Sequence, residues 1–202
     1  MTAIPVSELT SLIGKDMGHS DWLLVDQERV NQFAECTGDH QFIHIDEEKA
    51  KKTPFGGTIA HGFLSLSLVP TLSEGLLPRP EGLKMAVNYG MDSLRFIQPV
   101  RVGSRVRLHS TIIDVTEKNP GQWLLKARNT LEIEGVDKPA FISEGLSLYF
   151  VGSDRTLRGS RPATRRSGGY SPQRGISACS IPNCPRIRAT TKSTRSSIDC
   201  GL

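Results

Sequence analysis

The spacing of hydrophobic residues predicts a helix early in the chain. Val30, Phe33 and Ala34 recur at the spacing of one helix face, between Asp26 and Gly38. Aspartate is a favoured residue at the start of a helix, and glycine is favoured directly after its end. We therefore expect a helix that begins after Asp26 and ends at Gly38.

Two further helices are predicted before residue 80. One covers residues 47–52 and is capped by Asp46; its acidic residues precede its lysines, as the helix dipole favours. The other runs from about residue 60 to residue 72 and should bend at Pro70. It carries no charged residue, so we expect it to be buried on nearly all sides.

After Pro80, hydrophobic residues alternate with other residues in the pattern of half-buried strands. The alternation runs through residues 85–96 and resumes at 106–112 after a Val-Gly-Ser turn. Two more strands are expected over 123–134 and 140–150. Helices followed by strands at hairpin spacing predict an α+β fold, in which an antiparallel sheet wraps one long apolar helix.

Charge divides the chain into two parts. The 202 residues include 25 Lys and Arg and 21 Asp and Glu, but residues 152–202 hold ten of the basic residues and two of the acidic ones. The rest of the chain is therefore mildly acidic. We expect a folded domain over 1–151 and a disordered, basic Ser/Arg/Gly-rich tail over 152–202. Tyr170 is the only aromatic residue of this tail, which disfavours base stacking and nucleic-acid binding.

Three features bear on where the protein works. The N-terminus lacks a basic segment followed by an apolar run, the pattern of a signal peptide. Residues 53–73 are uncharged, but they include proline, glycine, histidine and serine and fall short of the ~20 predominantly apolar residues of a membrane span. The four cysteines form no C-x-x-C pair, which disfavours a disulfide framework or a zinc site. We expect a cytoplasmic protein.

Titratable residues cluster between the first two predicted helices. Asp39 and His44 lie in a stretch that we expect to be irregular. A carboxylate and an imidazole in a partly dry pocket can share a water molecule and exchange protons near neutral pH. Asp39 could equally cap a turn, and His44 could be an ordinary core residue. A metal site of Asp39, His40, His44 and His61 is also open, although an irregular backbone disfavours it.

A second cluster precedes the uncharged helix and contains Gly56, Gly57 and Gly62. The first N–H groups of a helix have no partner within the helix, so they can polarise a carbonyl oxygen. The glycines could instead serve only a tight turn and close packing. The residues by themselves favour neither interpretation.

A resemblance to a known family is carried by residues 33–68, FAECTGDHQFIHIDEEKAKKTPFGGTIAHGFLSLSL. This segment resembles the MaoC-like (R)-specific enoyl-CoA hydratases, and among them the subgroup of nodulation protein N and related actinobacterial dehydratases. Three landmarks match together: Gly-Asp-x4-His-x-Asp, the Phe-Gly before the helix and the Ala-His-Gly that opens it. Asn88-Tyr89-Gly90, Arg95-Phe96 and 99–104 are also similar. The resemblance covers about residues 5–151 and none of the tail.

This resemblance implies a hotdog fold, a long helix wrapped by an antiparallel sheet, which usually works as a dimer. It implies that Asp39 and His44 form the catalytic dyad and that the backbone N–H of Gly62 belongs to an oxyanion hole. The acyl chain would lie along the buried helix, and the pantetheine arm would enter between subunits. The remaining candidates for substrate binding are Ala60, His61, Asn88 and Tyr89.

The implied activity is (R)-specific addition of water to a 2-enoyl thioester, or its removal from a 3-hydroxyacyl thioester. The substrate would be carried by CoA or acyl carrier protein, and the chemistry needs no metal or organic cofactor. The chain departs from the family at two places. Gln41-Phe42 replace a common Asn-Pro, so Phe42 should narrow the pocket or alter how Asp39 is held. Pro70 stands where some hydratases have a serine, with Ser67 and Thr71 nearby.

Two other functions remain open. A hotdog thioesterase would need a carboxylate against the thioester carbon, which the Asp-x4-His block disfavours. An acyl-thioester-binding or regulatory module would retain the dyad without turnover, and Arg95 and the basic tail could then contact partners.

Overall fold

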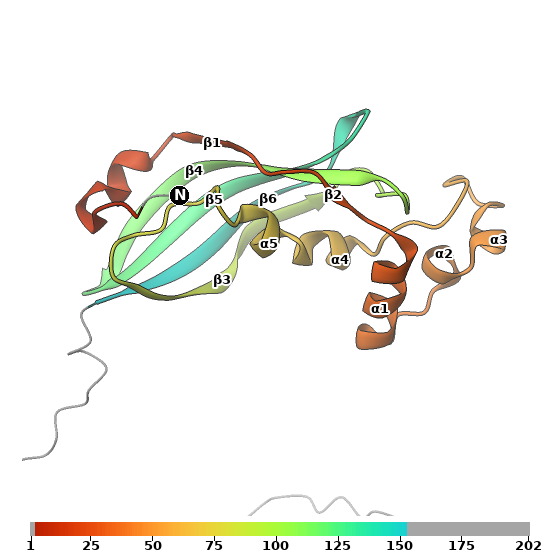
Figure 1. The fold of residues 1–202 in the computed structure, drawn as a ribbon, viewed down its shortest axis with the longest axis horizontal. Helices are drawn as coiled ribbons and strands as arrows, with labels where there is room; N and C mark the ends of the chain where they lie inside the picture. Colours follow the sequence, from red (N-terminus) through yellow and green to blue (C-terminus); the bar gives the residue numbers. More distant parts are fainter. Residues whose placement is uncertain (1–2, 153–202) are drawn as a thin grey trace, which may run out of the picture. The chain divides into compact units, whose positions relative to one another are not determined.

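The computed structural model describes residues 3–152, which form an antiparallel sheet with helices on one face and at one end (Figure 1). The sheet order is β1-β4-β5-β6-β3, and β2 also pairs with β4. The strands are β1 (Asp16–His19), β2 (Leu23–Leu24), β3 (Leu83–Phe96), β4 (Arg105–Asn119), β5 (Gln122–Ile133) and β6 (Val136–Val151). The predicted α+β hotdog fold is confirmed. The tail expected over 152–202 lies outside the described residues, apart from Gly152.

The helical elements are short. They are the 3-10 helix η1 (Val6–Leu12) and the α-helices α1 (Gln27–Thr37), α2 (Phe42–Ile45), α3 (Glu47–Ala50), α4 (Gly62–Ser67) and α5 (Val69–Ser73). Figure 1 shows α4 and α5 along the sheet, and α1, α2 and α3 gathered beyond one end of it. The helix predicted over 60–72 is therefore two segments, because Pro70 lacks the N–H that a continuous helix would need.

The predicted helix caps are confirmed. The carboxylate of Asp26 accepts a hydrogen bond from the Arg29 N–H at 2.8 Å, which satisfies a free donor at the start of α1. Gly38 ends this helix with a φ of 76°, a left-handed conformation that favours glycine. Asp46 accepts from the Lys49 N–H at 3.0 Å and so caps α3, which is shorter than predicted.

The main core lies between the helices and the sheet. Leu64, Leu68 and Leu72 follow one another at four-residue intervals, so they project from one face and pack with β4 residues such as Val106 and Leu108. Each buried leucine contributes about 2 kcal/mol of hydrophobic stabilisation.

The expectation that this helix is buried on nearly all sides is wrong, because Phe63 is 68% exposed. Another face of α4 and α5 borders two cavities instead of packed side chains. No helix among residues 3–152 is long and apolar enough to cross a membrane.

Candidate active site

Asp39 owes its position to the end of α1. Gly38 turns the chain away from the helix, and Asp39 is the next residue. Its carboxylate accepts a hydrogen bond from the Gln41 N–H at 3.3 Å, which turns the chain toward α2. The side chain of Asp39 is 55% exposed, so this carboxylate is open to solvent in the isolated chain.

His44 lies in α2, a single helical turn over Phe42–Ile45. The expectation of an irregular backbone is therefore wrong for these four residues and correct for those directly after Gly38. His44 is 6% exposed, and its Nδ1 lies 2.7 Å from the carbonyl oxygen of Ile59. A carbonyl oxygen only accepts, so Nδ1 donates, and in the neutral ring Nε2 keeps a free lone pair.

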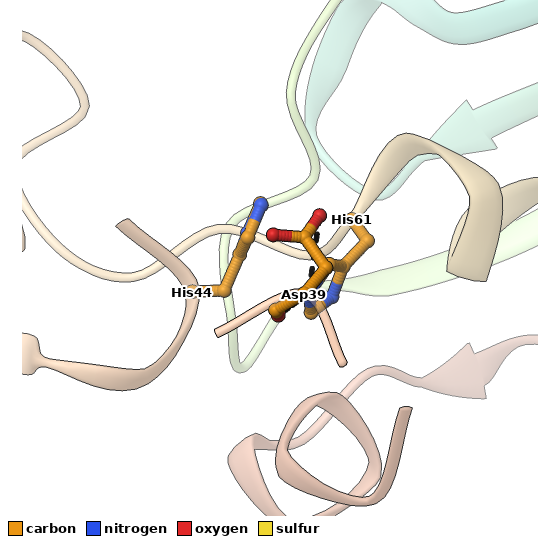
Figure 2. Close-up of side chains that lie close together, drawn as sticks. All are labelled: Asp39, His44 and His61. Atoms are coloured by element: carbon orange, nitrogen blue, oxygen red, sulfur yellow. Dashed lines mark hydrogen bonds and ion pairs between the residues drawn. The ribbon is translucent and has the colours of Figure 1, made fainter. Parts of the chain in front are cut away.

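His61 contacts both Asp39 and His44. It precedes α4 and is 3% exposed. Its Nε2–H donates to the backbone carbonyl oxygen of Asp39 at 2.9 Å, and its ring stacks on that of His44 with centroids 3.8 Å apart. Figure 2 shows the three side chains together. A carboxylate oxygen of Asp39 and one ring nitrogen each of His44 and His61 lie within 4.8 Å of one another.

Burial lowers the pKa of His44 below its ordinary value of 6.5, because the charged imidazolium is poorly solvated there. The hydrogen bond to the Ile59 carbonyl acts in the opposite direction, the neighbouring His61 lowers the pKa further, and Asp39 raises it. The lowered pKa means that His44 is mainly neutral near pH 7. A neutral imidazole with a free Nε2 can accept a proton from water.

A cavity of about 370 Å³ lies beside His44, and it will be called the catalytic cavity. Ala60, Gly62 and Ser65 line it from the segment that starts α4, and Phe96 lines it from the end of β3. A Cβ atom on Gly62 would lie 3.2 Å from the Phe96 ring, so glycine allows this ring to approach the helix. Gly62 thus has a packing role, and its N–H group lies at the first residue of α4.

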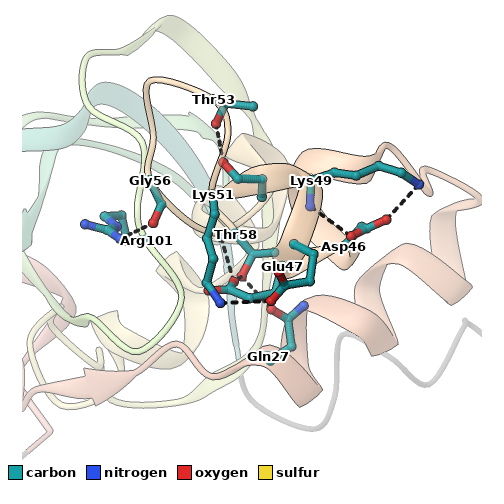
Figure 3. A network of polar contacts seen from close by, with 11 residues as sticks. Gln27, Asp46, Glu47, Lys49, Lys51, Thr53, Gly56, Thr58 and Arg101 are labelled. Carbon is teal, nitrogen blue, oxygen red and sulfur yellow. Dashed lines mark hydrogen bonds and ion pairs between the residues drawn. The ribbon is translucent and has the colours of Figure 1, made fainter.

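A polar network that includes Gln27, Glu47 and Thr58 (Figure 3) holds the backbone of His44 and of the segment that follows Thr58. The Gln27 Nε2 donates to the carbonyl oxygen of His44 at 2.7 Å, and the Gln27 Oε1 lies 2.6 Å from the Thr58 hydroxyl oxygen. The Glu47 carboxylate accepts a hydrogen bond from the Thr58 N–H at 3.0 Å, and the Ile59 N–H donates to the carbonyl oxygen of Ile43 at 3.0 Å. These bonds fix the segment whose carbonyl orients the His44 ring.

The comparison with known proteins agrees with this geometry. The sequence profile of the family described as "MaoC like domain" matches residues 8–133. The chain belongs to this MaoC-like family.

Relatives are similar over most of the described residues. The chain is 44% identical to 3-hydroxyacyl-thioester dehydratase Z of Mycobacterium tuberculosis over 144 residues, 71% of this chain and 95% of that protein. It is 39% identical to nodulation protein N of Rhizobium meliloti over 161 residues, 79% of this chain and all of that protein. The structure of an (R)-hydratase from A. caviae matches with a TM-score of 0.56 and 25% identity, over 67% of this chain and 94% of that one. The expected resemblance is confirmed.

The MaoC-like chain groups three titratable side chains that could contact a metal ion, namely Asp39, His44 and His61. The two rings stack with an interplanar angle of 26°, however, and nitrogen lone pairs lie in the ring planes. Stacked rings do not aim their lone pairs at a common point, which a tetrahedral site requires. His40 is outside the group: its ring nitrogen lies 3.8 Å from Glu35 on the surface. This arrangement fits proton transfer better than metal binding.

The other predicted residues are divided between two places in this MaoC-like fold. Ala60, His61 and Gly62 lie next to His44, whereas Asn88 and Tyr89 line a different cavity, between the helices and the middle of β3. Phe42 is 42% exposed and does not line the catalytic cavity, so it does not narrow that cavity.

Sequence reasoning did not identify two groups that support the site. Gln27 lies 17 residues before His44 and is an ordinary polar residue of α1 in the sequence. The Ile59 carbonyl is a backbone group and has no sequence signal. Only the folded arrangement brings them to His44.

Proposed function

We propose that this chain is an (R)-specific enoyl thioester hydratase that also catalyses the reverse dehydration of 3-hydroxyacyl thioesters. The observation that carries the proposal is the placement of the Asp39 carboxylate and the His44 imidazole together, with His44 bordering a cavity that also contains Gly62. The activities for which the dehydratase from M. tuberculosis and the (R)-hydratase from A. caviae are named support it.

In the proposed hydration, a water molecule near Asp39 and His44 attacks C3 of the 2-enoyl thioester. The dyad takes one proton from this water, and C2 receives a proton as the double bond is lost. We assign the proton transfers to Asp39 and His44 jointly, because interacting groups titrate as a pair. The free Nε2 of His44 and its lowered pKa support a role as proton acceptor.

The proposed role of the Gly62 N–H is to donate to the thioester carbonyl oxygen. Negative charge builds on this oxygen as water adds to C3, and a donor already in place stabilises that charge. The position of Gly62 on the wall of the catalytic cavity supports this role. Dehydration follows the same steps in reverse.

We further propose that the protein acts as a homodimer through β3. This strand pairs only with β6 among the described strands, so its other edge is unpaired. Met85, Val87, Tyr89 and Met91 are each 39–53% exposed along it. An unpaired edge with a row of exposed apolar side chains is a surface that a second copy would cover.

Light scattering tests the dimer. The wild type should have about twice the mass of one 22.2 kDa chain. Met85→Lys should weaken association, because it places a charge on the exposed apolar row. A monomeric wild type would contradict this proposal.

The substrate is a thioester of CoA or of acyl carrier protein. We propose that the protein works in the cytoplasm, and a substrate of this kind supports that location.

Crotonyl-CoA, a short 2-enoyl thioester, tests the function directly. Loss of the ultraviolet absorbance of its conjugated double bond, with formation of the (R)-3-hydroxy product, is the expected result. Release of free thiol would instead indicate a thioesterase. Binding without either reaction would indicate a regulatory acyl-thioester module. Either of these two outcomes contradicts the proposed hydratase.

A further inference from the structure

A second cavity, of about 540 Å³, lies between the helices α4 and α5 and the sheet. It shares no lining residue with the catalytic cavity, although both are bounded by α4 and β3. Side chains on its helix wall include Phe63, Ser67 and Pro70, and those on its sheet wall include Asn88, Asn129 and Ser147. We call this space the distal cavity.

The distal cavity follows the catalytic cavity along the helix. Gly62 and Ser65 face the catalytic cavity, while Phe63 and Ser67 face the distal one. The rings of Phe63 and Phe96 meet edge to face at this boundary, with centroids 5.9 Å apart. Phe63 is 68% exposed, so it is not locked by surrounding core packing. An acyl chain that reacts beside His44 and continues along α4 would therefore enter the distal cavity.

Asn129 is an unusual residue in the wall of this cavity. It is 5% exposed and lies on β5, where Leu125, Ala127, Leu131 and Ile133 are also buried at alternating positions. The Ser110 hydroxyl donates to its Oδ1 at 2.7 Å. This bond satisfies the carbonyl end of the amide and leaves the Nδ2 end for another partner.

The Nδ2 of Asn129 lies over Gly145 of β6, where a Cβ atom would come within 3.3 Å of it. Gly145 itself lines the distal cavity, so the missing side chain leaves space beside this nitrogen. No group of residues 3–152 accepts a hydrogen bond from Nδ2. Nδ2 is not among the buried side-chain atoms that lack a partner, a group that includes the hydroxyl of Ser143 opposite Asn129 on β6, so Nδ2 is accessible from the cavity. A ligand that displaces solvent from this nitrogen must supply an acceptor or leave the donor unpaired.

The two walls of the cavity differ in their available donors. On the helix wall, the Ser67 hydroxyl donates to Leu64 at 2.7 Å and the Ser73 hydroxyl donates to Pro70 at 3.0 Å. Their hydrogens are already used within the helices. On the sheet wall, the Asn88 side chain is exposed and the Ser147 side chain is half-buried, whereas Asn129 is buried. Asn129 therefore offers the donor that is held deepest in the wall of this cavity.

We propose that the distal cavity selects acyl chains that carry an acceptor oxygen, a ketone or a hydroxyl group, and that Asn129 Nδ2 donates a hydrogen bond to it. This inference rests on the proposed function, because it requires a thioester bound beside His44. A chain of methylene groups alone would leave the amide unpaired when it displaces water. A site with a buried donor therefore discriminates against the ligand that lacks the matching acceptor.

A set of paired substrates tests the proposal. Each pair consists of a 2-enoyl-CoA with a ketone at one position beyond C4 and the all-methylene 2-enoyl-CoA of equal chain length. For at least one ketone position, the kcat/KM of the wild type should be about tenfold higher for the ketone substrate than for the all-methylene substrate of equal length. Asn129→Leu removes the donor at similar volume, and its ratio should fall to about one. A wild type without preference at any position, or a preference retained in Asn129→Leu, overturns the proposal.

Gly145→Ala is a second variant that retains the amide. Gly145 has no left-handed φ, so alanine adds no backbone strain, but its Cβ would crowd Nδ2 and the cavity. This variant should lower kcat/KM for the long ketone substrate by about fivefold more than for crotonyl-CoA. An equal effect on both substrates overturns the proposal even if Asn129→Leu does not fold.

Calorimetry separates this inference from the proposed function. Binding of the corresponding saturated acyl-CoA pairs, which have no double bond to hydrate, to the wild type and to Asn129→Leu reads the contact without turnover. Failure to hydrate crotonyl-CoA contradicts the hydratase proposal, whereas equal binding of the paired thioesters by the wild type contradicts only the role of Asn129.

Discussion

The catalytic and distal cavities border the same helix and strand, but their polar groups are arranged differently. Around His44, the ring and the backbone are held by hydrogen bonds from Gln27 and to Ile59. In the distal cavity, Asn129 keeps a donor that the described residues leave without an acceptor. The difference suggests that the two cavities have different roles. The catalytic cavity holds the groups for the proton transfers common to all substrates, and the distal cavity contacts the part of the acyl chain that differs between substrates.

Removal of the dyad should have the largest effect, and it should be the same for every chain length. Asp39→Asn and His44→Ala should each lower kcat at least ~100-fold with short and long thioesters alike, since general acid–base catalysis contributes factors of 10²–10⁴. Steady-state hydration assays measure this. His40→Ala is the matched control, because His40 is exposed and its Nδ1 lies 3.8 Å from the Glu35 carboxylate, outside the group of Asp39, His44 and His61. Activity that survives in both dyad variants would refute the assignment.

Gly62→Ala should have the next largest effect. Its Cβ would lie 3.2 Å from the Phe96 ring, so the start of α4 or this ring must move within the catalytic cavity. We expect kcat/KM to fall by about 10–100-fold, because small misplacements of reacting groups are costly. The double variant Gly62→Ala/Phe96→Leu relieves the contact and should recover part of the loss. No recovery would argue against this steric cause.

Gln27→Leu tests whether the catalytic cavity depends on its polar support. The change removes the 2.7 Å hydrogen bond to the His44 carbonyl and the contact with Thr58. As a positioning residue, Gln27 should affect kcat, with a loss of about tenfold, more than KM. Gln32→Leu is the control on the same helix, since the Gln32 amide donates to the exposed Glu28 side chain at 3.3 Å, away from His44. Equal kinetics of the two variants would contradict the support role.

The pH dependence should give the smallest effect. The pKa of His44 lies below 6.5, so kcat/KM should stay level as the pH falls to about 6.5 and decline below it, as His44 gains a proton. Between the lowered pKa of His44 in the folded protein and its ordinary value of 6.5 in the unfolded chain, the unfolded chain binds this proton more readily. The free energy of unfolding should therefore decrease as the pH falls through this range. His44→Ala should show a shallower fall in chemical denaturation. An activity decline that begins well above pH 6.5 would contradict the lowered pKa.

The sequence by itself determined several helix ends, the four long strands and the candidate dyad. Asp26, Gly38 and Asp46 marked helix ends correctly, because capping depends on neighbouring residues. Alternation marked β3 to β6, because the period of a strand is visible along the chain. The Gly-Asp-x4-His spacing marked Asp39 and His44.

Only the tertiary structure decided how these parts act together. The stacking of His61 on His44, the support from Gln27 and the distal cavity beside Asn129 join residues far apart in the chain. It also decided that α4 has an exposed face at Phe63 and that Asp39 remains open to solvent. Such contacts depend on how whole elements pack, and the periodicity within each element carries no record of its neighbours.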